Sequence, residues 1–201
     1  MNIDKAIQAL QAKGYAVSFF QQPESAATYL ERVICHQTVG FGDSATLSSL
    51  RLFQRLSVCN QVYDPQNPAD GASFQETAQK ALTASIFLTS VNALAETGEL
   101  VNIDGTGNRI AGSLFGHKKV YFIAGTNKLV PTLQDAIWRA RNVAAPRNAK
   151  RLGLNTPCAK GDAGCFDCRS SERICNGMLL YLHKMDDIEM EVLLIDESLG
   201  L

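Results

Sequence analysis

Four cysteines close to the C-terminus have the strongest potential for chemistry in this chain. Cys158, Cys165, Cys168 and Cys175 follow the spacing Cys-x6-Cys-x2-Cys-x6-Cys. Mostly glycines and short polar residues fill the gaps, so the segment has little apolar surface to bury. It therefore needs a link between its sulfur atoms to become ordered. Three links fit these residues: a zinc ion in tetrahedral coordination, an iron–sulfur cluster, or disulfides.

The spacing leaves the identity of this link open. Zinc sites favour pairs of the form Cys-x2-4-Cys, and this chain has one such pair, Cys165 and Cys168, between two wider gaps. Iron–sulfur clusters accept more varied spacings, although ferredoxin motifs are tighter than this one. The N-terminus lacks the apolar core of a signal peptide, so we expect a cytoplasmic, reducing setting. There, clustered cysteines bind metal more often than they form structural disulfides, which favours an ion or a cluster.

A basic stretch leads into the cysteine segment. Residues 139–160 contain six basic residues and no acidic one. Four thiolates around a zinc ion, or around an oxidised cubane cluster, leave about two net negative charges. We therefore expect the basic stretch to offset a negative centre at the cysteines. Its members are Arg139, Arg141, Arg147, Lys150, Arg151 and Lys160.

A glycine-rich loop in TVGFGDSATL, residues 38–47, has the composition of an anion cradle. Glycines let the backbone approach a ligand closely, and the first amides of a following helix carry partial positive charge. The loop lacks the Gly-Lys-Ser/Thr ending of a nucleotide-binding P-loop. A tight turn from strand to helix, capped by Asp43 or Ser44, is an equally good interpretation. The predicted ligand-binding residues here are Gly40, Gly42, Asp43, Ser44 and Thr46.

A second polar segment, residues 92–109, contains a candidate catalytic carboxylate. Glu96 could act as a general base or as a nucleophile. Polar loops at the ends of strands are where open α/β sheets bind ligands. A plainer interpretation is a hairpin whose turns are held by Asp104 and Asn108. We predict that the ligand-binding residues from this segment and from the loop after the next strand are Thr97, Asp104, Asn108, Arg109 and Lys128.

The elements that must position these residues alternate between strands and helices. This alternation predicts a three-layer α/β fold, with an open, mostly parallel sheet and helices on both faces. Residues 119–124 are strongly apolar and are expected to form a central strand. Pro146 is expected to end or kink a helix that begins at Pro131. Residues 178–182 and 190–195 are expected to form the two final strands, which are predicted to be antiparallel neighbours.

Length and composition limit the classes of function. The 201 residues contain no internal repeat and suit a single domain, 1–201, with a cysteine-rich insert at about 155–176. With 46% apolar residues and a formal net charge of −1, the chain is globular and offers no global electrostatic attraction for nucleic acid. Its apolar runs are too short for a membrane span.

Several of these segments resemble the LUD (lactate utilisation) domain family. They are VGFGDSATL, ALAETGELVNIDGTGNRIAG, VYFIAGTNKLV and APRNAKRLGLNTPC, and the pattern AETG-x-LVN-x-DG-x-GNR is the most specific. The resemblance implies a fold like that of ribose-5-phosphate isomerase, glucosamine-6-phosphate deaminase and the CoA transferases. In those enzymes, the loop that resembles residues 40–46 holds a phosphate or a carboxylate. The family also implies a role in bacterial lactate oxidation, with partner subunits that carry iron–sulfur clusters.

The chain also departs from the pattern of this family, because it carries its own cysteine cluster and no ferredoxin-type extension. We predict an accessory or redox component of lactate or related organic-acid utilisation, which binds a small anionic metabolite and works with oxidoreductase partner subunits. The alternative is an isomerase-like or transferase-like enzyme that acts through Glu96 on a small phosphorylated or carboxylated substrate and has a structural zinc. A third hypothesis is a binding scaffold in which the cysteine segment forms a zinc-stabilised lid. Both catalysis and assembly into a homo-oligomer stay open at this point.

Overall fold

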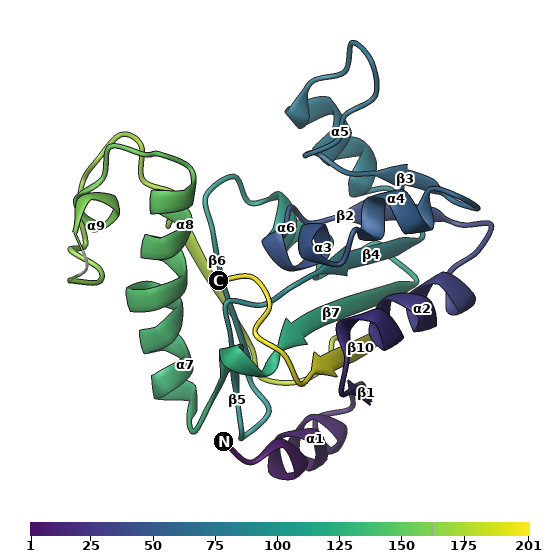
Figure 1. The fold of residues 1–201 in the computed structure, drawn as a ribbon, viewed down its shortest axis with the longest axis horizontal. Coiled ribbons are helices and arrows are strands. Elements are labelled where there is room, and N and C mark those ends of the chain that lie inside the picture. Colours follow the sequence, from purple (N-terminus) through teal and green to yellow (C-terminus); the bar gives the residue numbers. More distant parts are fainter. Residues whose placement is uncertain (162) are drawn as a thin grey trace.

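A six-stranded parallel sheet forms the centre of the protein in a computed structural model that describes residues 1–161 and 163–201 (Figure 1). Every neighbouring pair of strands in this sheet is parallel. The predicted open α/β sheet is therefore confirmed. In spatial order the strands are β1 (Ala16–Phe20), β10 (Glu189–Ile195), β7 (Lys119–Gly125), β4 (Ile86–Thr89), β2 (Thr38–Phe41) and β3 (Gln61–Tyr63).

Helices cover both faces of this sheet and bury two apolar cores against it. The first core packs α1 (Ile3–Ala12) and α5 (Phe74–Ala81) against one face. The second packs α2 (Pro23–Val33), α3 (Ala45–Ser49) and α4 (Leu52–Leu56) against the other. Apolar residues recur at helical spacing along α1 and α2, which is why each helix buries one stripe.

A smaller four-stranded sheet stands beside the large one. Its order is β8 (Leu129–Val130), β5 (Ala93–Ala95), β6 (Leu100–Asp104) and β9 (Gly177–Tyr181). β5 and β6 form an antiparallel hairpin, and β6 leads into α6 (Asn108–Gly112). A third apolar core packs this sheet against the helix that begins with α7 (Leu133–Arg139). The short η1 helix (Thr126–Lys128) connects β7 to β8.

The helix does not end at Pro146, because the chain stays helical through it, so of the two predicted outcomes only a kink stays a prediction. A π-helical turn, η2 (Ala140–Ala144), follows α7, and α8 (Ala145–Arg151) begins directly before the proline. Proline lacks an N–H and clashes with the carbonyl four residues earlier. The wider π turn just before it relieves this conflict. The cysteine segment then starts with the short helix α9 (Pro157–Lys160).

The prediction of two antiparallel final strands is wrong. β9 pairs with β6 in the small sheet, and β10 lies between β1 and β7 in the large one. From Met190 onward, β10 is fully buried, as a strand inside a parallel sheet must be. β9 starts with exposed residues, which suits the edge of a sheet. None of the helices in the described part of the chain is long and apolar enough to cross a membrane.

Candidate functional site

The glycine-rich loop follows β2 and turns directly into α3. Ser44 caps the helix by accepting a hydrogen bond from the Leu47 amide, at 3.4 Å. The glycines make room for the protein itself. A Cβ at Gly40 would lie 2.3 Å from the carbonyl oxygen of Ala81, and one at Gly42 would lie 2.9 Å from Thr89 Oγ1. The packing therefore supports a tight, capped turn at these two positions.

Lys128 is the most unusual side chain near this loop. It is only 3% exposed, and its ammonium donates hydrogen bonds to Thr46 Oγ1 and Ser90 Oγ, both at 2.8 Å. Both acceptors are neutral, and within residues 1–161 and 163–201 no carboxylate pairs with the ammonium. Burial, together with the positive charges of Arg139 and Arg109, lowers the pKa of Lys128 to about 7.

Two arginines add positive charge to the same region. Arg139 is buried and donates to the carbonyl oxygens of Asn92 and of Asn127, the latter at 3.2 Å, and to the main-chain oxygen of Leu201 at 3.4 Å. Burial and, secondarily, Arg147 lower its pKa to about 10.

The second arginine, Arg109, donates to the carbonyl oxygens of Asp43 at 3.3 Å and Ile103 at 2.8 Å. Its Nε is buried without a partner in the described structure. Three positive charges thus share one region, and Lys128 and Arg109 donate hydrogen bonds to neutral oxygens.

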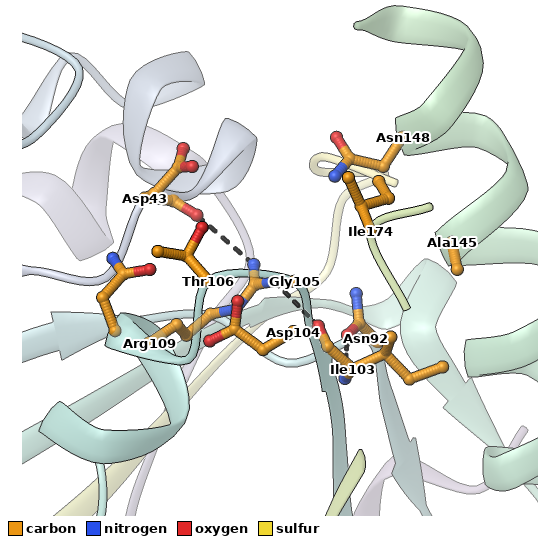
Figure 2. Close-up of a pocket in the computed structure, with 11 residues that line it drawn as sticks. Asp43, Asn92, Ile103, Asp104, Gly105, Thr106, Arg109, Ala145, Asn148 and Ile174 are labelled. Carbon is orange, nitrogen blue, oxygen red and sulfur yellow. Dashed lines mark hydrogen bonds between the residues drawn. The ribbon is translucent and has the colours of Figure 1, made fainter. Parts of the chain in front are cut away.

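A polar cavity of about 70 Å³ opens beside Arg109 (Figure 2). Asp43 and the loop after β6 line one side, and Asn148 from α8 lines the other. A second cavity, of about 30 Å³, reaches Lys128 and shares Arg109, Asn92 and Asn148 with the first. Seven predicted residues line these two cavities: Asp43, Ser44, Thr46, Asp104, Asn108, Arg109 and Lys128.

The C-terminal residues 199–201 cover Lys128. Thr46 Oγ1 lies 3.5 Å from the carbonyl oxygen of Leu199, and Leu201 lines the smaller cavity. Gly200 has a positive φ of 66°, and a Cβ there would lie 2.4 Å from Thr46 Oγ1. The glycine therefore lets the backbone pass directly over the buried cation. Reasoning from the sequence missed this segment together with Ser90, Asn92, Arg139 and Asn148.

The family model of the LUD domain matches residues 3–195, which is nearly the whole chain. The chain belongs to the LUD domain family. A solved structure with the same fold is a DUF162 family protein from Deinococcus radiodurans, which is 12% identical with a TM-score of 0.54. That alignment covers 96% of this chain and 95% of the other, so it shows a shared fold.

A second solved structure, eIF2B beta from Chaetomium thermophilum, is 12% identical over 66% of this LUD domain chain and 44% of its own. Its TM-score is 0.34, which is too low to support an argument. No curated protein sequence matches the chain.

Glu96 and Thr97 lie away from the cavities of this LUD domain. In the β5–β6 hairpin Ala93 is opposite Val101, so Asn92 and Asp104 share one end and Glu96 lies at the other. The Glu96 carboxylate accepts hydrogen bonds from the Asn2 amide at 2.8 Å and from Lys5 Nζ at 3.3 Å. The Asn2 contact and then Lys5 lower the pKa of Glu96. The catalytic role of Glu96 stays a prediction.

The four cysteines of the LUD domain are free thiols, and three of them line two different cavities. Cys158 lines one cavity with Arg147, and Cys165 and Cys175 line the other. In the part of the chain that the structure describes, no three His, Cys, Asp or Glu side chains gather around a point that could hold a metal ion. A zinc or iron–sulfur site at these cysteines therefore stays a prediction.

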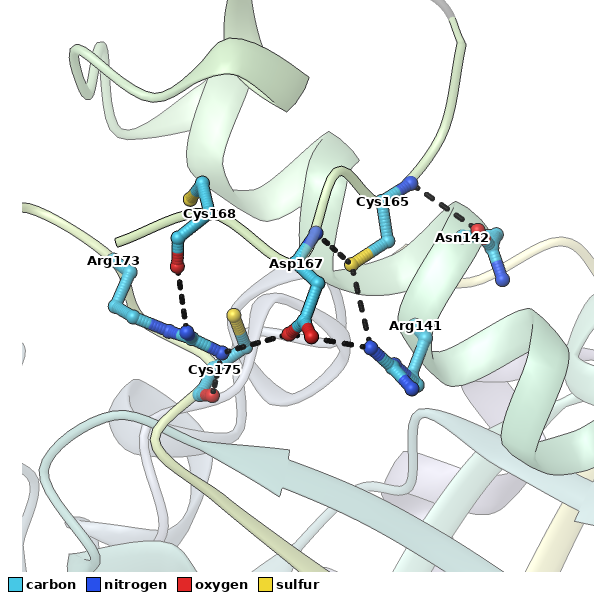
Figure 3. Close-up of polar contacts among 7 residues, drawn as sticks. All are labelled: Arg141, Asn142, Cys165, Asp167, Cys168, Arg173 and Cys175. Carbon is cyan, nitrogen blue, oxygen red and sulfur yellow. Dashed lines mark hydrogen bonds and ion pairs between the residues drawn. The ribbon is translucent and has the colours of Figure 1, made fainter. Parts of the chain in front are cut away.

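Two arginines, Arg141 and Arg173, contact residues of the cysteine segment (Figure 3). Arg141 lies 3.9 Å from Cys165 Sγ and 3.5 Å from the Asp167 carboxylate. Arg173, from within the segment, donates to the carbonyl oxygens of Cys168 and Cys175. Arg139, from the same basic stretch, instead lies close enough to Lys128 to lower the pKa of that lysine. The basic stretch thus places positive charge in two different regions of the molecule.

Proposed function

We propose that this LUD domain binds a small anionic metabolite, through a phosphate or carboxylate group, at Lys128. The supporting observation is a buried ammonium whose only hydrogen-bond acceptors, among the described residues, are two hydroxyls. Moving an ion from water into the protein interior costs several kcal/mol when no opposite charge pairs with it. An anion beside Lys128 and Arg109 would offset this cost.

The rest of the cavity lining suits a ligand that also carries polar groups. The side chains of Asp43, Asn92 and Asn148 border the larger cavity, and they can accept or donate hydrogen bonds to hydroxyl or carbonyl groups. A small organic acid or a phosphorylated metabolite has this combination of groups. Within a family named for lactate utilisation, we place the chain as an accessory component of organic-acid metabolism that binds this ligand and passes it to, or senses it for, partner oxidoreductase subunits.

Calorimetry with inorganic phosphate and with L-lactate tests this proposal. We expect at least one of these anions to bind. At about 100 times its Kd, it should raise the stability by about 2.7 kcal/mol, which corresponds to a rise in Tm of roughly 5–10 °C. Lys128→Met should abolish the binding. Lys80→Met, which removes an exposed lysine from α5, is the matched control and should bind as the unmodified protein does. Absence of binding, or equal binding by both variants, would contradict the proposal.

The cofactor predicted at the four cysteines is tested separately from the anion site. Anaerobic purification followed by metal and sulfide analysis should yield zinc, or iron with sulfide and a visible absorption band. Cys168→Ser should lower the metal content, and Cys59→Ser, outside the segment, should leave it unchanged. A metal-free protein that folds normally would contradict the prediction of a metal or cluster at the four cysteines.

A further inference from the structure

Two cysteines outside the C-terminal segment, Cys35 and Cys59, lie on neighbouring backbone segments. Cys35 follows α2 and Cys59 precedes β3. The amide of His36 donates to the carbonyl oxygen of Cys59 at 3.0 Å, and the amide of Gln61 donates to that of Gln37 at 3.0 Å. Paired backbones of this kind lie about 4.8 Å apart. Cys59 lies opposite His36, so Cys35 is one residue out of register with it, and the two Cα atoms are expected at about 6 Å, within the range that a disulfide requires.

The Cys59 thiol is also close enough to that of Cys35 to shift the pKa of Cys35. Cys59 Sγ lies 3.7 Å from the carbonyl oxygen of Ile34 and 3.5 Å from Asn60 Nδ2. The neighbouring Cys59 thiol and, to a smaller extent, burial raise the pKa of Cys35. Both residues are half-buried, so a small reagent can reach them.

We propose that Cys35 and Cys59 form a reversible intramolecular disulfide, which makes this pair a redox modification site. The oxidant is a low-molecular-weight disulfide such as oxidised glutathione. One cysteine thiolate attacks it, forms a mixed disulfide and releases one glutathione thiolate. The other cysteine then attacks the cysteine sulfur of the mixed disulfide and releases the second. The two thiols lose two electrons and two protons, and oxidised glutathione gains them to become two glutathione molecules.

The position of the pair predicts what the disulfide would change. Cys35 precedes β2, whereas the loop beside Lys128 follows β2, so the two sites lie at opposite ends of one strand. The disulfide would close a loop of about 25 residues, across α3 and α4, and would restrict the unfolded chain. Oxidation should therefore stabilise the sheet edge formed by β2 and β3 and leave anion binding intact.

The test is to incubate the full-length protein with oxidised glutathione at pH 7 and pH 8.5, block free thiols with an alkylating agent and map the peptides. We expect a peptide in which Cys35 is linked to Cys59, formed faster at pH 8.5 because Cys35 stays protonated at neutral pH, and lost again with a dithiol reductant. The Tm should rise by roughly 5–10 °C relative to the reduced protein, and this rise should be absent in Cys59→Ser.

Three results would overturn the proposal. Both cysteines could stay alkylatable, each could stop at a mixed disulfide with glutathione, or the disulfides could form only among residues 158–175. Peptide mapping of the unmodified protein distinguishes these results without depending on any variant. Cys35→Ser should give a stable mixed disulfide at Cys59, because the resolving thiol is missing. Its failure to accumulate one would also contradict the mechanism.

Discussion

Two lysines at opposite ends of β7 illustrate two ways of placing a charge inside this protein. Lys119, at the start of the strand, forms an ion pair with the buried Glu191 at 2.9 Å. Burial alone would lower its pKa, but Glu191 and Tyr121 more than offset this effect, and the pKa is raised. Lys128, just after the end of the strand, has two hydroxyl partners, and its pKa falls to about 7.

The difference separates a structural charge from one that lacks a counter-ion. At the start of β7 the protein supplies the carboxylate itself, and Ser18 and Tyr29 donate further hydrogen bonds to Glu191. At the other end, Lys128 and Arg109 have neutral acceptors, although the carboxylates of Asp43 and Asp104 border the neighbouring cavity. Ligands of open α/β sheets bind at the carboxyl ends of the strands, which is where Lys128 lies.

Substitution of each lysine by methionine should have opposite effects on stability, and this is the largest effect that we expect. Lys119→Met leaves the Glu191 carboxylate buried and unpaired, so it should lower the free energy of unfolding by about 2–4 kcal/mol. Lys128→Met removes an uncompensated charge and should raise that free energy by about 1 kcal/mol. Chemical denaturation measures both changes. A loss of similar size in both variants would mean that Lys128 is also structural.

The pH dependence of anion binding should follow Lys128. A carboxylate ligand stays ionised above about pH 5, whereas Lys128 loses its proton around pH 7. The affinity for L-lactate should therefore fall about tenfold per pH unit above that pKa. The unliganded protein should instead gain stability as the pH rises from about 7 to 10.4, because only the unfolded lysine keeps its proton there. Lys128→Met should lose both dependences, and a pH-independent affinity in the unmodified protein would contradict the assignment.

Glu96→Gln should have the smallest effect on the anion site. Because Glu96 lies at the far end of the β5–β6 hairpin, calorimetry should show an unchanged anion affinity. The Tm should fall slightly, since the contacts of Glu96 with Lys5 and the Asn2 amide are weakened. Any turnover that is found in this protein should be measured in the same variant. Loss of turnover with unchanged binding would support the predicted catalytic role.

The sequence predicted the large sheet and much of the candidate site, because these depend on local patterns. The apolar strands, the cap at Ser44, and the polar segment around Asp104 and Arg109 each have a signature within a few residues. Lys128 was predicted as a ligand-binding residue. Its burial, however, follows from the packing of residues 199–201, which no local pattern reveals. Arg139 was predicted to offset charge at the cysteines, because the sequence does not give the register of its helix on the small sheet.

Several arrangements differ from what the sequence suggests, because proximity along the chain does not predict direction in space. Glu96 and Asp104 are eight residues apart, yet an antiparallel hairpin places them at opposite ends. β9 and β10 follow each other in the chain but belong to different sheets. The π turn before Pro146 arises from backbone geometry that residue types alone do not specify.

An NMR titration of the lysine side chains tests the central claim most directly. The Lys128 resonance, assigned by its absence in Lys128→Met, should titrate near pH 7 in the unliganded protein, and its pKa should rise when inorganic phosphate or L-lactate is added. Lys119 should stay charged throughout, as its ion pair with Glu191 requires. If Lys128 titrates near the ordinary value of about 10.4, or if its pKa does not respond to either anion, the claim that Lys128 is a buried cation that binds an anionic ligand is wrong.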